Sequence, residues 1–411
     1  MSAVAELTIQ TMLSIENSVA INVPQEVLIE IFSTFHNRCA ALKACSLVNK
    51  AWMHASRVVL FRSVNLTPLL AQKDWLSVFM RVPLDIGDHA REIVVKNARW
   101  AAESSRIRVL LLSNFATSAT TLKLSNLTIS DFADFTHIVS ILKRLDMLSI
   151  QHVGFEYNTL NLSDSIPPNR SIPPTLSSLY LYHVDLGLLF GWFLGHDAVP
   201  KLSRAYFGPL ESSWKTKAQQ FLNHNVFNLS EVSFLFADTA VTPYTSYCAA
   251  SIKQNRLLPA AADLQHLMDK YQTRYGIQLI LAGLPLGENF RILRVHRFFY
   301  GKSRLMAIRS VWAARLLVNV QQGFRGRVIL DVDISSVREI NELEIDWEFL
   351  EDMFSVGVFC EMEAVVFLVL TNISIASLES LIALKMPRSY ARGILRFEEA
   401  HETTIRPVDI L

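Results

Sequence analysis

The segments LDMLSIQHVGF (145–155) and LSSLYLYHVDL (176–186) decide the fold, because they align without a gap. Both carry an apolar residue at the same five positions, which are Leu145, Leu148, Ile150, Val153 and Phe155 in the first and Leu176, Leu179, Leu181, Val184 and Leu186 in the second. Alternating apolar residues predict a short strand in each segment, and a helical stretch follows. The pair therefore predicts a repeated strand–helix unit.

Weaker copies of this unit occur at residues 90–100, 121–129, 202–210 and 229–236. We take one anchor residue as equivalent in each copy, and the steps between successive anchors are 26 to 31 residues; the anchors are Ile93, Leu122, Leu148, Leu179, Ala205 and Val232. This spacing lies near the upper end of the leucine-rich-repeat period of ~20–29 residues. The steps are irregular and the usual turn asparagine is missing, so the copies are degenerate.

Strand–helix units of this kind bury their apolar faces only by stacking on one another. We therefore expect an α/β fold in which residues 90–405 form an irregular leucine-rich-repeat solenoid. Residues 237–289 do not follow the repeat spacing and are expected to be an irregular insert. Beyond them we expect strands at 290–299, 327–334, 364–370 and 394–399, with helices at about 305–320, 347–354 and 376–385.

The segment before the repeats is VPQEVLIEIFSTFHNRCAALKACSLVNKAWMHASRVVLFRSVNL (23–66). It contains three short apolar runs at helical spacing, around Ile31, Leu42 and Trp52. A piece below about 40–50 residues seldom buries enough surface to be stable alone. The segment must therefore pack against the rest of the chain or against a partner.

This segment resembles the F-box, in the form common in large fungal families that carry degenerate leucine-rich repeats after it. The matching residues, in order, are Val23-Pro24-Gln25-Glu26-Val27-Leu28, Ile31-Phe32, Leu42-Lys43-Ala44-Cys45-Ser46-Leu47-Val48, Trp52, Ser56-Arg57 and Leu60-Phe61-Arg62-Ser63-Val64. The departure is Val23, where leucine is usual. The resemblance covers about a tenth of the chain. It divides the chain into a leader (1–20), an F-box of three helices (20–66), a helical linker (67–89) and the repeats (90–405).

The resemblance implies a function. F-box helices dock onto the Skp adaptor of a cullin–RING ubiquitin ligase, and the remainder of the chain holds a protein target for ubiquitination. The adaptor-binding residues that it implies are Val23, Pro24, Val27, Leu28, Ile31, Leu42, Cys45, Val48 and Trp52. The same residues could instead form the private core of a helical subdomain. A second interpretation is a non-catalytic scaffold that acts outside a ubiquitin ligase, with the F-box as an internal cap.

The strand pattern also predicts a target-binding surface. Side chains alternate along a strand, so the neighbours of the inward leucines face the other way. On that face we expect Lys123, Ser125, Ser149 and Gln151, together with the candidate target-binding residues Tyr180, Tyr182, Tyr206, Arg294 and His296. Tyrosine and arginine are enriched in protein interfaces. The alternatives are a merely solvated sheet face and a face covered by the insert.

The composition excludes several other functions. Of the 411 residues 51% are hydrophobic and 19% charged, and the net charge is +1, so we expect no nucleic-acid partner. The chain has no apolar run of ~18 residues, so we expect no membrane span. Four scattered cysteines and no secretory signal favour a reduced cytoplasmic or nuclear location.

Fragments that resemble catalytic motifs are incomplete. Gly301-Lys302-Ser303 lacks the companion glycine of a phosphate-binding loop, because His296 stands at that position. Asp331 and Asp333 alternate on a strand and could bind a cation, but solvated strand positions are far commoner. We therefore expect a chain that is not an enzyme and that needs no cofactor or metal.

Overall fold

The computed structural model describes residues 23–36, 38–67, 85–97, 115–157, 171–195, 200–210, 220–222, 224–225, 228–236, 291–300, 325–335, 347–355 and 362–400. The predicted leader, the predicted insert at 237–289 and the predicted helix at 305–320 lie outside these residues. So does the predicted linker, apart from its two ends.

The chain has an α/β fold in which a group of helices precedes a parallel sheet. The helices are α2 (Gln25–Ser33), α3 (Cys39–Cys45), α4 (Lys50–Leu60), α7 (Asp85–His89), α9 (Phe132–Ile141), α10 (Leu186–Leu194), α14 (Trp347–Ser355), α15 (Ile375–Lys385) and α16 (Pro387–Ala391). The strands are β1 (Ser63–Asn65), β2 (Glu92–Lys96), β3 (Thr121–Asp131), β4 (Met147–Tyr157), β5 (Ser178–Val184), β6 (Arg204–Leu210), β7 (Glu231–Phe236), β8 (Ile292–Tyr300), β9 (Arg327–Ile334), β10 (Ala364–Thr371) and β11 (Leu395–Glu399). The strands predicted at the end of the chain are confirmed as β8 to β11.

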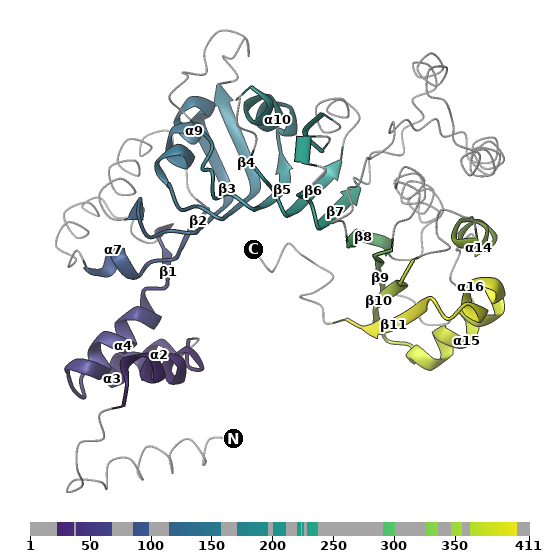
Figure 1. Cartoon of the computed structure of the whole chain (residues 1–411), viewed down its shortest axis with the longest axis horizontal. Helices are drawn as coiled ribbons and strands as arrows, with labels where there is room; N and C mark the ends of the chain where they lie inside the picture. The colour runs from purple at the N-terminus through teal and green to yellow at the C-terminus, as the bar shows by residue number, and fades with distance from the viewer. Residues whose placement is uncertain are drawn as a thin grey trace, which may run out of the picture.

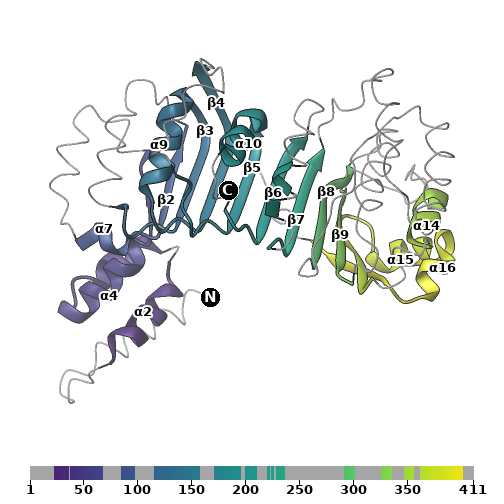
Figure 2. The same ribbon diagram turned by 45° about the horizontal axis from the view of Figure 1, so that its top comes forward.

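The described strands form one parallel sheet in which each strand pairs with its neighbours in the sequence, from β1 to β11. The sheet is curved, and α9, α10, α14 and α16 lie on its convex side (Figure 1). Figure 2 shows β2 to β9 side by side in chain order, with α2 and α4 beyond one end. Two parallel neighbouring strands must be joined by a crossover connection, and in this sheet each connection leads to the adjacent strand.

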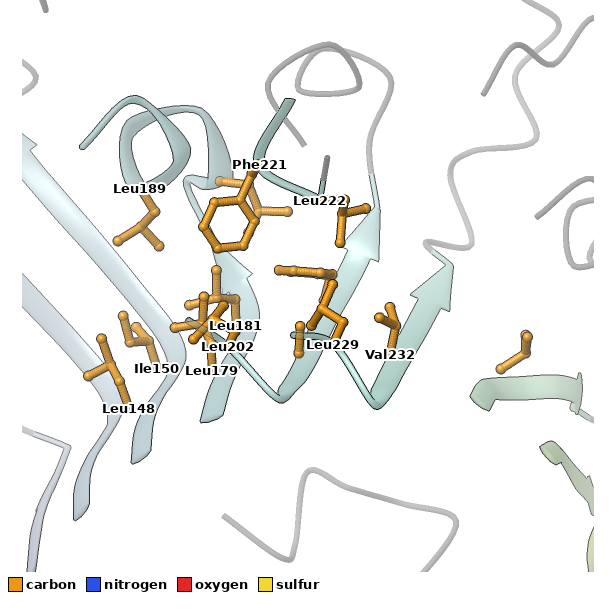
Figure 3. Close-up of a cluster of buried hydrophobic side chains, with 14 of the residues drawn as sticks. Leu148, Ile150, Leu179, Leu181, Leu189, Leu202, Phe221, Leu222, Leu229 and Val232 are labelled. Atoms are coloured by element: carbon orange, nitrogen blue, oxygen red, sulfur yellow. The ribbon is translucent and has the colours of Figure 1, made fainter. Parts of the chain in front are cut away.

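The predicted anchor residues are confirmed as one row across the sheet. Ile93 pairs with Leu122, and the row then passes through Leu148, Leu179, Ala205 and Val232. It continues beyond the predicted copies through Leu293, Val328, Val365 and Leu395. All of these side chains are buried in a single apolar core. Figure 3 shows Leu148, Leu179 and Val232 in this core, together with Phe221 and Leu222 from the connections between strands.

A left-handed residue within or directly after each of four successive strands explains the spacing of the leucines. Asn97, Asn126, His152 and His183 have φ between 49° and 52°. Simple alternation would direct Leu127 to the opposite face from Leu124, because the two residues are three positions apart. The left-handed Asn126 adds one unpaired residue, so Leu127 also points into the core, where it is buried.

Strands β2 to β8 also begin in a repeated hydrogen-bond arrangement, which we call the turn ladder. Two consecutive backbone N–H groups donate to one carbonyl of the preceding unit, as Thr120 and Thr121 do to Arg91. The accepting residues are Arg62, Arg91, Thr120, Asp146, Ser177, Ser203 and Ser230. The ladder thus starts at the residue that separates α4 from β1.

The helices on the convex side are held by aromatic packing. Phe132 and Phe135 of α9 and Trp192 of α10 are fully buried. The Trp192 ring meets both phenylalanine rings edge-on, at centroid distances of 6.3 and 5.8 Å. Such pairs add about 0.5–1.5 kcal/mol each beyond the area they bury. These ring contacts connect the strand–helix unit of β3 and α9 with that of β5 and α10.

Candidate interaction surfaces

The N-terminal helices α2, α3 and α4 have a small core of their own. Leu28, Phe32, Leu42, Ala55 and Val59 are buried together, separately from the core of the sheet. The Phe32 and Trp52 rings meet edge-on at 5.3 Å. Asn49 caps α4 by accepting a hydrogen bond from the Trp52 N–H at 2.9 Å.

The nine residues implied as adaptor-binding fall into three groups. Leu28 and Leu42 are buried inside the helical core. Val23, Cys45 and Trp52 are partly buried against it, and burial raises the pKa of the Cys45 thiol. Pro24, Val27, Ile31 and Val48 are exposed. Of the three groups, the last is the one whose side chains are exposed to a partner in this structure.

Leu47 is an exposed apolar residue that was not among the nine residues implied as adaptor-binding. It lies in the turn between α3 and α4 and is 86% exposed, and its neighbour Val48 is 60% exposed. Together with Val27 and Ile31 on α2 these residues form what we call the exposed apolar set. Leu47 falls between Ser46 and the capping Asn49, where helical spacing no longer indicates which way a side chain points.

The helical unit continues directly into the sheet. Strand β1 begins at Ser63, and the next residue after the strand, Leu66, is buried in the core of the sheet. The rings of His54 on α4 and His89 on α7 meet edge-on at 5.2 Å. The first strand therefore lies inside the segment that the sequence assigned to the F-box.

The second surface is the sheet face opposite the leucines, which we call the polar face. It carries Lys123, Ser125, Ser149, Gln151, Tyr180, Tyr182, Tyr206, Ser233, Arg294, His296 and Asp331. The tyrosines were expected to be open to solvent, and this was wrong for two of them, because Tyr182 and Tyr206 are only 5% and 4% exposed. Tyr180 is partly exposed, and its ring stacks on that of Tyr206 at 6.3 Å. Rings at paired positions on neighbouring strands cover one another.

Arg294 and His296 converge on one buried carboxylate. Asp331 is fully buried, and it accepts hydrogen bonds from the Arg294 Nε and Nη2 at 3.0 and 3.1 Å. The His296 Nδ1 lies 2.6 Å from the Asp331 Oδ2, within ion-pair distance. The His296 ring in turn meets Tyr206 edge-on at 5.0 Å.

The contacts of Asp331 and Asp333 argue against a cation site at these two aspartates. Asp331 already has arginine and histidine partners, and Asp333 accepts hydrogen bonds from the Ser335 N–H and hydroxyl. Within the described residues no group of three or more His, Cys, Asp or Glu side chains could hold a metal ion. Among the described helices, none combines the length and apolar character needed to cross a membrane.

No protein-family model matches the chain, and no curated protein matches it at a significant level. The resemblance of residues 23–66 to an F-box therefore depends on the residues quoted for it and on the surface that they form.

Proposed function

We propose that the chain is the substrate-recognition subunit of a Skp–cullin–F-box ubiquitin ligase, in the cytoplasm or nucleus. In this proposal α2, α3 and α4 bind the Skp adaptor, and the sheet is an irregular leucine-rich-repeat solenoid whose polar face binds a protein target. The observation that carries the proposal is the exposed apolar set on the helical unit. The chain would act by positioning its target and supply no reacting group of its own.

The energetics of the helical unit favour a partner. Among the described residues its buried core contains five side chains, which is little for an independent fold. Four further apolar side chains stay outside, and one of them, Leu47, is almost fully solvated. Fully burying a leucine contributes about 1.5–3 kcal/mol. An adaptor that covers the exposed apolar set would both gain this energy and complete the unit.

The polar face supports the second half of the proposal. It carries three tyrosines on β5 and β6 and an arginine and a histidine on β8, and the last two contact the fully buried Asp331 of β9. Because Asp331 holds Arg294 and His296, their side chains are oriented before any target arrives. Pre-oriented side chains lower the entropy cost of binding.

Binding of the full chain to a purified Skp adaptor tests the proposal. We expect Ile31→Asp combined with Leu47→Asp to weaken the affinity by at least about a hundredfold, since two buried apolar contacts of ~1.5 kcal/mol or more each are lost. The matched control is Leu384→Asp on α15, which also replaces a largely exposed leucine but lies on a different surface. Unchanged adaptor binding in the double variant, with its fold intact by circular dichroism, would refute the assignment.

The continuity between α4 and β1 favours one alternative, a scaffold in which the helical unit caps the sheet and no ligase forms. Co-purification separates the two functions. A substrate receptor retains cullin together with the adaptor, whereas a scaffold retains the adaptor alone or neither protein.

A further inference from the structure

Two histidine rings stack on neighbouring strands at the edge of the polar face. His152 on β4 and His183 on β5 have ring centroids 4.5 Å apart, and their planes differ by 17°. Both residues are exposed, and both are in the left-handed backbone conformation. Equal backbone conformation at equivalent positions of two paired strands is what places the rings side by side.

The position itself does not require histidine. Asn97 and Asn126 occupy it on the two preceding strands with nearly the same φ. Asparagine and histidine both tolerate this conformation better than most residues do. The backbone therefore explains the geometry of the pair, and it leaves the identity of the two side chains unexplained.

The Tyr182 ring packs against both histidine rings. Its ring meets His152 edge-on at 5.1 Å and His183 edge-on at 4.5 Å, and it is itself buried. The tyrosine thus limits how far either imidazole can turn away from the other. Two nitrogen donors remain close together at the surface.

We propose that His152 and His183 together bind a divalent transition-metal ion of the class that prefers imidazole, such as Zn²⁺ or Cu²⁺. Two nitrogens on one such ion lie about 3 Å apart, because each bond is ~2.0–2.1 Å long. The rings must therefore turn toward each other from their stacked position, which their exposure permits. Two protein ligands leave the other coordination positions to water.

The inference is independent of the proposed ligase function.

The test uses the untagged full chain and the variants His152→Asn and His183→Asn. Asparagine is the matched replacement, because it already occupies this position on β2 and β3. The control is His224→Asn, which removes an exposed histidine elsewhere, one whose Nδ1 lies 2.8 Å from the Gln220 carbonyl. Zn²⁺ binding is measured by titration calorimetry, and Cu²⁺ coordination by electron paramagnetic resonance.

We expect the pair to bind one Zn²⁺ per chain, with an affinity about tenfold or more weaker in either variant and unchanged in the control. The Cu²⁺ spectrum should show coupling to two imidazole nitrogens in the unaltered chain and to one in each variant. Equal Zn²⁺ affinity in all four proteins would overturn the inference. So would a Cu²⁺ spectrum of the unaltered chain that lacks the second nitrogen, and this readout does not depend on how the variants fold.

Discussion

Glu351 ties the C-terminal helices α14 and α16 together. Its carboxylate is almost fully buried at the start of α16, where it accepts hydrogen bonds from the Arg388 N–H at 2.5 Å and from the Ser389 N–H and hydroxyl at 3.2 and 2.5 Å. A carboxylate at this end of a helix satisfies N–H groups that have no partner within the helix. In the opposite direction, Arg392 donates to the Phe354 carbonyl at the end of α14.

Glu351→Ala should therefore be costly. It leaves the Ser389 N–H and hydroxyl buried without an acceptor, and each such group costs about 1–3 kcal/mol. We expect a total loss of about 3–5 kcal/mol in the stability of the α14–α16 region. The neighbouring Asp352→Ala is the matched control, because Asp352 pairs with the exposed side-chain end of Arg388. Exposed pairs of this kind contribute about 1 kcal/mol or less.

Hydrogen exchange of the α16 amides is the appropriate assay. Stacked units need not unfold in one step, so a global midpoint could miss a local loss. Exchange of the Ser389 amide should accelerate by at least about a hundredfold in Glu351→Ala, and by less than about fivefold in Asp352→Ala. Similar protection in the two variants would show that the buried carboxylate does not hold α16, and the reasoning would fail.

Three further predictions concern other parts of the chain. Asn126→Val should destabilise the chain by about 1–2 kcal/mol because a β-branched residue is strained at φ 52°, whereas Asn126→Gly should cost almost nothing; urea denaturation measures both. Leu28→Ala should lower the stability of the helical unit by about 2–5 kcal/mol, but Leu47→Ala by less than about 0.5, as thermal melts of the two variants would reveal. Burial raises the pKa of Glu92, but hydrogen bonds from Lys123 and Ser63 outweigh it and hold this pKa below the usual 4.5. The ionised carboxylate thus contributes stability that is lost as the pH falls below about 4.5, and Glu92→Gln should reduce the difference between urea midpoints at about pH 6 and about pH 3.5.

The row of anchor residues could be predicted from the sequence because its signal is purely local. Leu148 and Leu179 follow the same spacing as their neighbours, and a buried parallel strand requires that spacing whatever surrounds it. Even Ala205 and Val232, which are not leucines, were assigned to the correct row. Their place is set by the distance along the chain to the units on either side.

The surfaces were harder to predict because they depend on contacts across strands. Strict alternation gave the correct face for Tyr182 and Tyr206, yet it carries no information on whether neighbouring rings cover them. Likewise, nothing local distinguishes the buried Leu28 from the exposed Leu47.

The strictly sequential strand order also has a consequence for how the chain assembles. Each pairing closes a loop whose length is the distance between paired anchors, and these lie 26 to 37 residues apart at every step except one. The exception is β7 with β8, where Val232 pairs with Leu293, about twice as far along the chain. Doubling a loop adds ~0.6 kcal/mol of closure entropy. Loop length thus divides the pairings into two short-range sets, β1–β7 and β8–β11, and we expect the pairing of β7 with β8 to be the slowest of them to form.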